Sequence, residues 1–116
     1  MSLSVVPKAN LWLERDGEVV LSRWRVQLLE AVESSGSISA AAECMQVQYR
    51  CAWDKIEEME ARLGVRLVER QVGGTGGGGA RLTEVGRQYV ERFNAFAQGM
   101  DAFVAQQFQQ AFPAGL

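Results

Sequence analysis

Residues 36–70 predict two helices separated by a short break, and this pair constrains the fold more than any other part of the chain. The first helix is short and small-sided, with Ile38 followed by alanine at 40–42. The second runs from about 48 to 63, and its apolar face recurs at helical spacing: Ala52, Ile56, Met59 and Leu63. Because alanine allows close packing, the short helix can lie tightly against the longer one, which predicts a helix-turn-helix unit.

Two elements are predicted before this unit. Residues 11–21 hold short apolar runs on either side of Asp16-Gly17, and both turn positions tolerate positive φ, so we expect a β-hairpin. An isolated hairpin is only marginally stable, so it should pack on the helices or pair with a partner subunit. A helix capped by Ser22 follows, which gives three helices within 23–63.

A glycine-rich loop follows the second helix of the unit. We expect a strand at 65–72, a loop at 73–79 in which every residue but one is glycine, and a return strand at 80–82. This order is typical of the wing of a winged helix-turn-helix, here 65–82. A flexible linker is one alternative, but the roughly 34 residues after it are too few for a second core. A nucleotide phosphate loop is another, but it usually needs Lys-Ser/Thr after the glycines, and ARL follows here.

A long helix is predicted from Thr83 to about Phe112, where Pro113 ends it. A helix of about 30 residues is about 45 Å long, and a core of this size cannot cover all of it. Its large apolar residues recur at the alternating spacing of a coiled-coil seam. We therefore expect a dimerisation helix over 83–112, with these residues in its seam: Tyr89, Phe93, Phe96, Met100 and Phe103.

Length and composition limit the class of protein. With 116 residues, of which 47% are apolar, we expect 1–116 to form a single, mainly α domain with a small β component. No apolar run approaches the roughly 18 residues of a membrane span, so we expect a cytoplasmic protein without a membrane partner. The chain has no His and only two cysteines, Cys44 and Cys51, so we expect no metal site, no cofactor and no enzyme chemistry.

Basic residues gather on the second helix of the unit and on the wing, although the chain as a whole is acidic. The net charge is −2 and the pI about 5.2, which argues against DNA binding if charge is averaged over the whole chain. Acids are interleaved with the bases, so the composition is compatible with DNA binding without supporting it. The bases are Arg50, Lys55, Arg62, Arg66, Arg70 and Arg81.

The outward face of the second helix carries the functional prediction. Tyr49, Arg50 and Trp53 lie near its N-terminal end, the end that usually reaches base edges in the major groove. Gln48 can pair with adenine and Arg50 with guanine, while the glycine wing, with Arg70 or Arg81 nearby, can approach the phosphate backbone. The alternative is that Tyr49 and Trp53 pack against the wing or the hairpin and leave Arg50 in solvent.

Several segments resemble the LysR-type winged helix-turn-helix: GSISAAAE, AWDKIEEMEARLG, VRLVER, the glycine run and LTEVGR. They are more similar still to the N-terminal DNA-binding domain of the molybdate-responsive ModE family. The specific part is the pattern YRxAWD with Ile56, Glu58 and Met59, together with GGxGGGGA and LTxxG. LysR-type proteins generally lack so glycine-dense a wing, which favours ModE, and the resemblance covers about residues 20–100.

The resemblance implies a dimeric bacterial transcriptional regulator whose third helix enters the major groove and whose wing contacts the DNA backbone. Family members usually carry Ser where this chain has Gln48 and Cys51, so contacts from these positions should differ. The chain stops at Leu116, which leaves no room for the family's molybdate-binding region, so we do not expect molybdate dependence of this polypeptide. The residues predicted to bind DNA are Ser39, Gln48, Tyr49, Arg50, Trp53, Lys55, Gly74, Thr75 and Arg81.

The sequence is compatible with two functions. The first is a sequence-specific DNA-binding regulator, of molybdenum- or molybdate-related genes by the resemblance, that binds a two-fold operator as a homodimer. The second is a protein-interaction module whose aromatic C-terminal helix recruits a separate sensor or regulator. The outward helix face supports the first, whereas the acidic pI and the missing effector region support the second.

Overall fold

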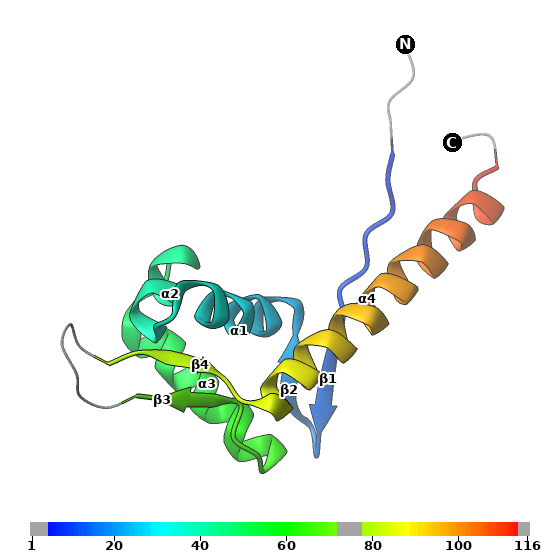
Figure 1. Ribbon diagram of the computed structural model, residues 1–116. Helices are drawn as coiled ribbons and strands as arrows, with labels where there is room; N and C mark the ends of the chain where they lie inside the picture. The colour runs from blue at the N-terminus through cyan, green and yellow to red at the C-terminus, as the bar shows by residue number, and fades with distance from the viewer. Residues whose placement is uncertain (1–4, 72–77, 114–116) are drawn as a thin grey trace.

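Helices and two small hairpins make up the computed structural model, which describes residues 5–71 and 78–113 (Figure 1). In chain order the elements are β1 (Trp12–Arg15), β2 (Glu18–Ser22), α1 (Arg23–Ser35), α2 (Ile38–Cys44), α3 (Tyr49–Leu63), β3 (Val68–Arg70), β4 (Ala80–Leu82) and α4 (Glu84–Ala111). This is a mainly helical winged helix-turn-helix, which confirms the predicted fold class. No helix in the described residues combines the length and the apolar character needed to cross a bilayer.

β1 and β2 form the hairpin at the N-terminal side of the fold. Asp16 and Gly17 both have positive φ, 53° and 80°, as a tight two-residue turn of this kind requires. β2 contributes buried residues to the core, whereas every residue of β1 is exposed. Near the turn, Arg15 Nη1 donates to the carbonyls of Arg62 and Leu63 at the end of α3, at 3.1 and 3.3 Å. The hairpin therefore packs on the helices through one strand and its turn.

Capping residues set the ends of the three core helices. The hydroxyls of Ser22 and Ser37 each accept a backbone N–H three residues further on, at 3.2 and 3.0 Å, and so start α1 and α2. Gly36 and Gly64 end α1 and α3 with φ of 84° and 73°, which residues with a side chain rarely adopt. The largest fully buried side chains of the shared core are Leu21, Leu28, Leu29, Ile56, Met59, Leu67, Val26, Val32 and Val68.

The first wing strand is shorter than the sequence predicted. β3 holds three residues, which pair antiparallel with β4. The backbone at its start is bonded to a side chain, because Glu60 Oε2 accepts the N–H groups of Leu67, just before β3, and of Val68, its first residue, at 2.9 and 3.1 Å. Thr83 Oγ1 donates to the Arg66 carbonyl at 2.8 Å in the same region. Hydrogen bonds to Glu60 of α3 and to Thr83 at the start of α4 thus take the place of the strand pairing that the alternating sequence predicted before β3.

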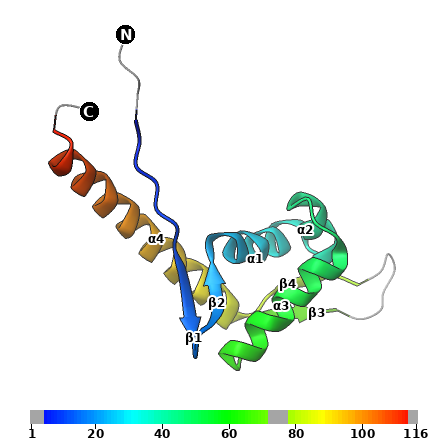
Figure 2. The ribbon, with the colours of Figure 1, turned by 180° about the vertical axis from the view of Figure 1, so that it is seen from behind.

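α4 lies on the core with its first half and projects away from it with its second half (Figures 1 and 2). Thr83 caps it, since its hydroxyl also accepts the Gly86 N–H at 2.9 Å. Gly86 has no room for a side chain, because a Cβ there would overlap the Leu67 carbonyl oxygen. Arg87 pairs with Glu33 of α1 at 3.0 Å. These contacts fix the direction in which the helix leaves the core.

The residues of the predicted seam share one side of α4 but differ in burial, so the whole seam is not free for a partner chain. The prediction that Phe93 lies in a dimer seam is wrong, because Phe93 is 2% exposed and belongs to the core of its own chain. Tyr89 packs partly against the same core. Met100 is half-buried, and Phe96 and Phe103 are exposed, at 44% and 52%. The cause is that the first half of α4 rests on α1 and β4, so one of its faces serves the intrachain core.

Candidate nucleic-acid interface

The N-terminal turn of α3 presents an exposed polar face. Arg50 has a side chain 80% exposed, and its pair with Asp54 at 3.5 Å is an i,i+4 surface contact that holds it weakly. Tyr49 is exposed beside it. Gln48 is the exposed N-cap residue, and within the described residues its side chain makes no capping hydrogen bond. Three of the residues predicted to bind DNA therefore lie together at the tip of this helix.

A groove joins this tip to α2 and to the base of the wing. Its volume is about 380 Å³, and its lining includes Ser39 of α2, Tyr49 and Trp53 of α3, and Gly78 and Gly79 beside β4. Side chains from two helices thus meet the backbone of the glycine-rich segment at one place. A helix tip beside a close-approaching backbone suits a ligand that offers both base edges and phosphates.

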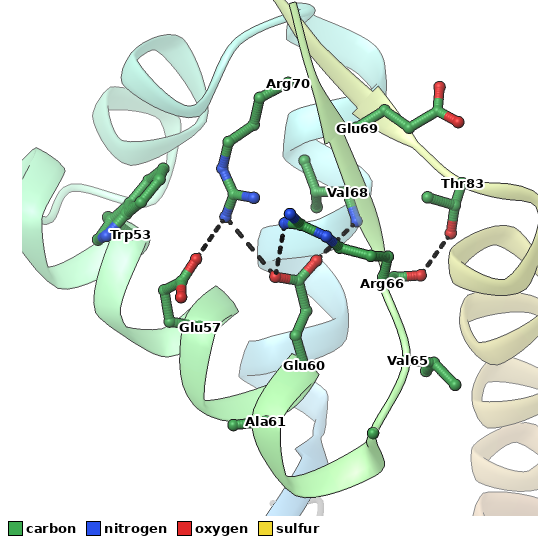
Figure 3. A pocket seen from close by; sticks show the side chains of 11 residues that line it. Trp53, Glu57, Glu60, Ala61, Val65, Arg66, Val68, Glu69, Arg70 and Thr83 are labelled. Carbon is green, nitrogen blue, oxygen red and sulfur yellow. Dashed lines mark hydrogen bonds and ion pairs between the residues drawn. The ribbon is translucent and has the colours of Figure 1, made fainter.

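Trp53 packs against the wing, which was the alternative interpretation of this residue. The Arg70 guanidinium of β3 lies 4.1 Å from the centroid of the indole ring, and the indole is half-buried (Figure 3). A cation over the face of a tryptophan is the most favourable cation–π pairing. One face of the ring is therefore already occupied, and Trp53 belongs to the joint between α3 and β3.

Glu60 is the residue at this joint that the sequence interpretation missed. Its side chain is 9% exposed and lies in an open cleft of about 970 Å³ between α3 and the wing (Figure 3). While its Oε2 accepts the backbone N–H groups of Leu67 and Val68 at the start of β3, its Oε1 is 3.7 Å from Arg70 and 3.8 Å from Arg66. Glu60 follows Trp53 by seven residues, so both lie on one face of α3. This spacing is the sequence signal from which a contact between Glu60 and the wing could have been predicted.

Lys55 lies apart from the other residues predicted to bind DNA. Its Nζ is 3.5 Å from Glu58, and Glu58 also meets Arg25 at 3.0 Å and Arg62 at 3.4 Å. Lys55 and Trp53 are two positions apart, so they point to nearly opposite sides of α3. The hydrogen bond from Arg25 is the main cause that lowers the pKa of Glu58; burial opposes it, and the charge of Lys55 adds to it. Lys55 thus belongs to an ion-pair cluster that joins α3 to α1.

The described part of the wing carries two exposed cations. Arg81 has a side chain 60% exposed, and its Nε is 3.0 Å from Glu69, its cross-strand partner. Arg66 is exposed just before β3. Gly74 and Thr75, which were predicted to contact DNA, lie outside the described residues.

The described residues form no candidate metal centre. In the ranges 5–71 and 78–113, no group of three or more His, Cys, Asp or Glu residues is placed to hold a metal ion. Cys44 is exposed and Cys51 is half-buried, both as free thiols.

The solved structures most useful for comparison are DNA complexes of regulators. The DNA-binding domain of CbnR bound to DNA matches with a TM-score of 0.59 and 23% identity, over 75% of this chain and 94% of that one. The DNA-binding domain of BenM bound to benA site 1 DNA matches with a TM-score of 0.57 and 21% identity, over 75% and 92%. At these identities the likeness establishes the fold, the winged helix-turn-helix of LysR-type DNA-binding domains.

Curated relatives give higher identities over part of their length. The molybdenum transport protein ModE of Azotobacter vinelandii is 41% identical over 87 residues, which are 75% of this chain and 32% of that protein. The DNA-binding transcriptional dual regulator ModE of Escherichia coli K12 is 43% identical over 74 residues, 64% and 28%. The molybdenum-pterin-binding protein MopB of Rhodobacter capsulatus is 39% identical over 88 residues, 76% and 32%. The chain spans about a third of the length of these relatives.

The family model described as bacterial regulatory helix-turn-helix protein, lysR family, matches residues 24–87. This match runs from α1 to the first turn of α4, so it includes the helix-turn-helix and the wing. Together with the ModE relatives it confirms the resemblance predicted from the sequence, and it assigns the chain to regulatory DNA-binding domains rather than to an enzyme family. The chain belongs to the lysR family of bacterial regulatory helix-turn-helix proteins and is homologous to part of ModE.

Proposed function

We propose that this chain is a sequence-specific DNA-binding transcriptional regulator that binds a two-fold operator as a homodimer. The observation that carries the proposal is the exposed tip of α3 beside the wing, where Tyr49 and Arg50 stand clear of the core. The DNA complexes of the CbnR and BenM domains support it through the shared fold. Acting on a bacterial chromosome, the protein would work in the cytoplasm.

The contacts divide by position. Gln48 and Arg50, at the tip of α3, are proposed to read base edges in the major groove, because amide and guanidinium groups pair with adenine and guanine. Ser39 and Arg81 are proposed to contact phosphates on either side of that groove, and so are Gly74 and Thr75 of the glycine-rich sequence. The groove between α2, α3 and the wing supports this division, since Ser39 lies in its lining.

The proposed dimer uses the middle and the second half of α4. Phe96 and Phe103 lie seven residues apart, so they share one side of a helix, and both are exposed. Burying one Phe side chain contributes about 1.5–3 kcal/mol, which a second copy of the projecting helix can supply. A homodimer places two copies of α3 symmetrically, so we expect inverted half-sites about one helical turn of DNA apart, or a multiple of that.

Molybdenum-related genes are the proposed targets. The relatives named as ModE and as molybdenum-pterin-binding proteins support this assignment through their identity to this chain. The chain covers about a third of each, so any molybdate response would need residues beyond this match. The second candidate function, recruitment of a separate sensor or regulator through α4, is favoured by the same exposed aromatic residues, Phe96 and Phe103.

The salt dependence of duplex binding tests the proposal against this alternative. A dimer that neutralises several phosphates should bind duplex DNA at about 50 mM salt and lose affinity steeply as salt rises. Fluorescence anisotropy of a labelled duplex from the promoter region of a molybdenum-related operon measures this slope. A folded dimer that does not bind duplex DNA at low salt would contradict the proposed DNA-binding function. The protein-interaction function would then be the remaining proposal.

A further inference from the structure

We infer that Arg70 is a positioning residue, which fixes the Trp53 indole and joins the wing to α3, and is not one of the cations that neutralise phosphates. The inference rests on the proposed DNA binding and deepens it. The sequence placed Arg70 with Arg81 among the bases available to the phosphate backbone. The structure separates these two arginines of the same hairpin.

The guanidinium of Arg70 already has three partners. It lies 4.1 Å from the centroid of the Trp53 ring, its Nη2 is 3.0 Å from Glu57 Oε1, and the same nitrogen is 3.7 Å from Glu60 Oε1 (Figure 3). Only 18% of the Arg70 side chain is exposed. Its Nε is buried and has no hydrogen-bond partner among the described residues.

Arg81 has the opposite surroundings. Its side chain is 60% exposed, and one exposed carboxylate, that of Glu69, pairs with it. An exposed pair of this kind contributes little and can be exchanged for a phosphate at low cost. Arg70 would have to leave an aromatic face and two carboxylates to do the same. Of the two, only Arg81 is free to become a phosphate ligand.

The partners of Arg70 all stand on one face of α3. Trp53, Glu57 and Glu60 follow at spacings of four and three, so they lie above one another along the helix. Arg70 reaches this face from β3 and contacts each of the three. It therefore sets both the orientation of the indole and the distance between the recognition helix and the wing.

A planar guanidinium is required for this role. It can stack on the indole and still direct its N–H groups sideways to carboxylates, whereas the ammonium of lysine keeps the charge without the plane. A phosphate ligand at position 70 needs only the positive charge, whereas the proposed positioning role also needs the planar shape of the guanidinium. A phosphate ligand should tolerate Arg70→Lys, and a positioning residue should not.

The first test compares the salt dependence of operator binding for Arg70→Lys, Arg70→Gln and the matched control Arg81→Gln. We expect Arg81→Gln to reduce the slope of log K against log salt by about 0.9, the value of one phosphate contact. Both Arg70 variants should keep the slope and lose roughly tenfold in preference for the operator over a scrambled duplex. If Arg70→Gln reduces the slope as Arg81→Gln does, and Arg70→Lys restores it, the inference is overturned while the proposed function stands.

The second test needs no DNA, so it separates this inference from the proposed function. The chain is labelled with 5-fluorotryptophan, and the Trp53 resonance is assigned through Trp53→Phe. We expect both Arg70 variants to move or broaden the Trp53 fluorine resonance, and Arg81→Gln to leave it in place. An unmoved resonance in folded Arg70→Lys and Arg70→Gln chains would overturn the positioning role. Absence of duplex binding by the unsubstituted chain would overturn only the proposed function.

Discussion

Arginine side chains in this domain differ in whether carboxylates already hold them. Arg25 is buried and bonded to Glu58 at 3.0 Å, and Arg70 is enclosed at the joint of α3 and the wing, whereas Arg50 is 80% exposed with a weak surface pair. Many acids of the chain are thus engaged by arginines that hold the fold together. The net charge of −2 therefore says little about the field at the tip of α3.

At residue scale, Arg50 and Arg81 should respond differently to substitution. We expect Arg50→Ala to cost about 1–3 kcal/mol on the operator and to relax the preference among bases, since it removes the proposed base contact. Arg81→Ala should weaken binding to all duplexes alike, because it removes the proposed phosphate contact. Competition binding with operator and scrambled duplexes measures both effects. Equal loss of preference in the two variants would contradict the division between helix tip and wing.

Glu58 gives the domain a predictable dependence on pH. Its pKa is lowered in the folded state, mainly by the hydrogen bond from Arg25, so its stabilisation is present above the unfolded-state value of about 4.3. That stabilisation is lost as pH falls through the lower folded-state pKa. We expect Glu58→Gln to reduce the free energy of unfolding by about 1–2 kcal/mol at neutral pH, because a charge-assisted bond is lost.

Urea unfolding at neutral pH and at about pH 3 checks this, because below the ordinary pKa the unfolded-state carboxyl takes up a proton and the contribution of the folded-state carboxylate falls. The difference between Glu58→Gln and the unsubstituted chain should shrink at the lower pH. Glu91→Gln is the control, because Glu91 is exposed on α4 and makes no ion pair within the described residues. A Glu58→Gln deficit that stays constant across this range would show that the carboxylate charge is not the cause.

At the scale of elements, α4 is the helix whose direction depends on one glycine. Gly86 sits where α4 crosses the Leu67 backbone, and no side chain fits there. Gly99, later in the same helix, has open space around the position of a Cβ. Substituting Gly86 therefore tests the packing of α4 against Leu67, whereas substituting Gly99 tests only the low helix propensity of glycine.

We expect Gly86→Ala to destabilise the fold by about 1–3 kcal/mol, because the added methyl group overlaps backbone. Gly99→Ala should instead stabilise it by up to about 1 kcal/mol, the helix propensity difference between the two residues. Thermal and urea unfolding of the two variants measure these changes. A stable Gly86→Ala chain with an unchanged α4 would mean that the crossing of α4 over Leu67 is looser than described.

Local signals in the sequence were enough to predict these elements, but long-range contacts were not. Asp16-Gly17, Gly36 and Gly64 act through their own backbone angles, so the hairpin turn and two helix ends could be predicted. The short β3 depends on Glu60, and the burial of Phe93 depends on how α4 meets the core. Both features depend on how elements that are distant in the sequence pack together. The spacing of apolar residues within one element does not predict such packing.

The candidate site shows the same limit. The exposure of Arg50 follows from its place opposite the core face of α3, so it could be predicted from periodicity. Trp53 and Arg70 meet across two elements that are joined by a loop, and two interpretations of Trp53 were equally compatible with the sequence. Only the arrangement of β3 against α3 distinguishes them.

As a whole, the molecule is an elongated body with a projecting helix, 60 × 35 × 22 Å along its principal axes (Figures 1 and 2). Arg23, at the start of α1, pairs with Asp101 of α4 at 2.8 Å and donates to the Ala9 carbonyl at 3.4 Å. The N-terminal segment is therefore held near the second half of α4. The α3 tip and the wing lie away from that half, which leaves both proposed surfaces accessible at once.

The proposed dimer is testable at this scale. We expect Phe96→Asp to give monomers in sedimentation experiments, because a carboxylate cannot be buried unpaired in an apolar helix interface. Gln98→Asp is the matched control, since it adds the same charge to an exposed position of α4 off the aromatic face. A dimer that persists in Phe96→Asp would move the interface elsewhere, with the exposed strand β1 as the next candidate.

Selection of bound duplexes from a random library by the purified chain tests the central claim most directly. A dimer that presents two copies of the α3 tip should enrich inverted half-sites whose centres are about 10 base pairs apart, or a multiple of that. The same selection with Arg50→Ala should keep the spacing and lose preference at defined positions within each half-site. Enrichment of no common sequence by the unsubstituted chain, or of sequences without two-fold symmetry, would contradict a dimeric DNA-binding regulator.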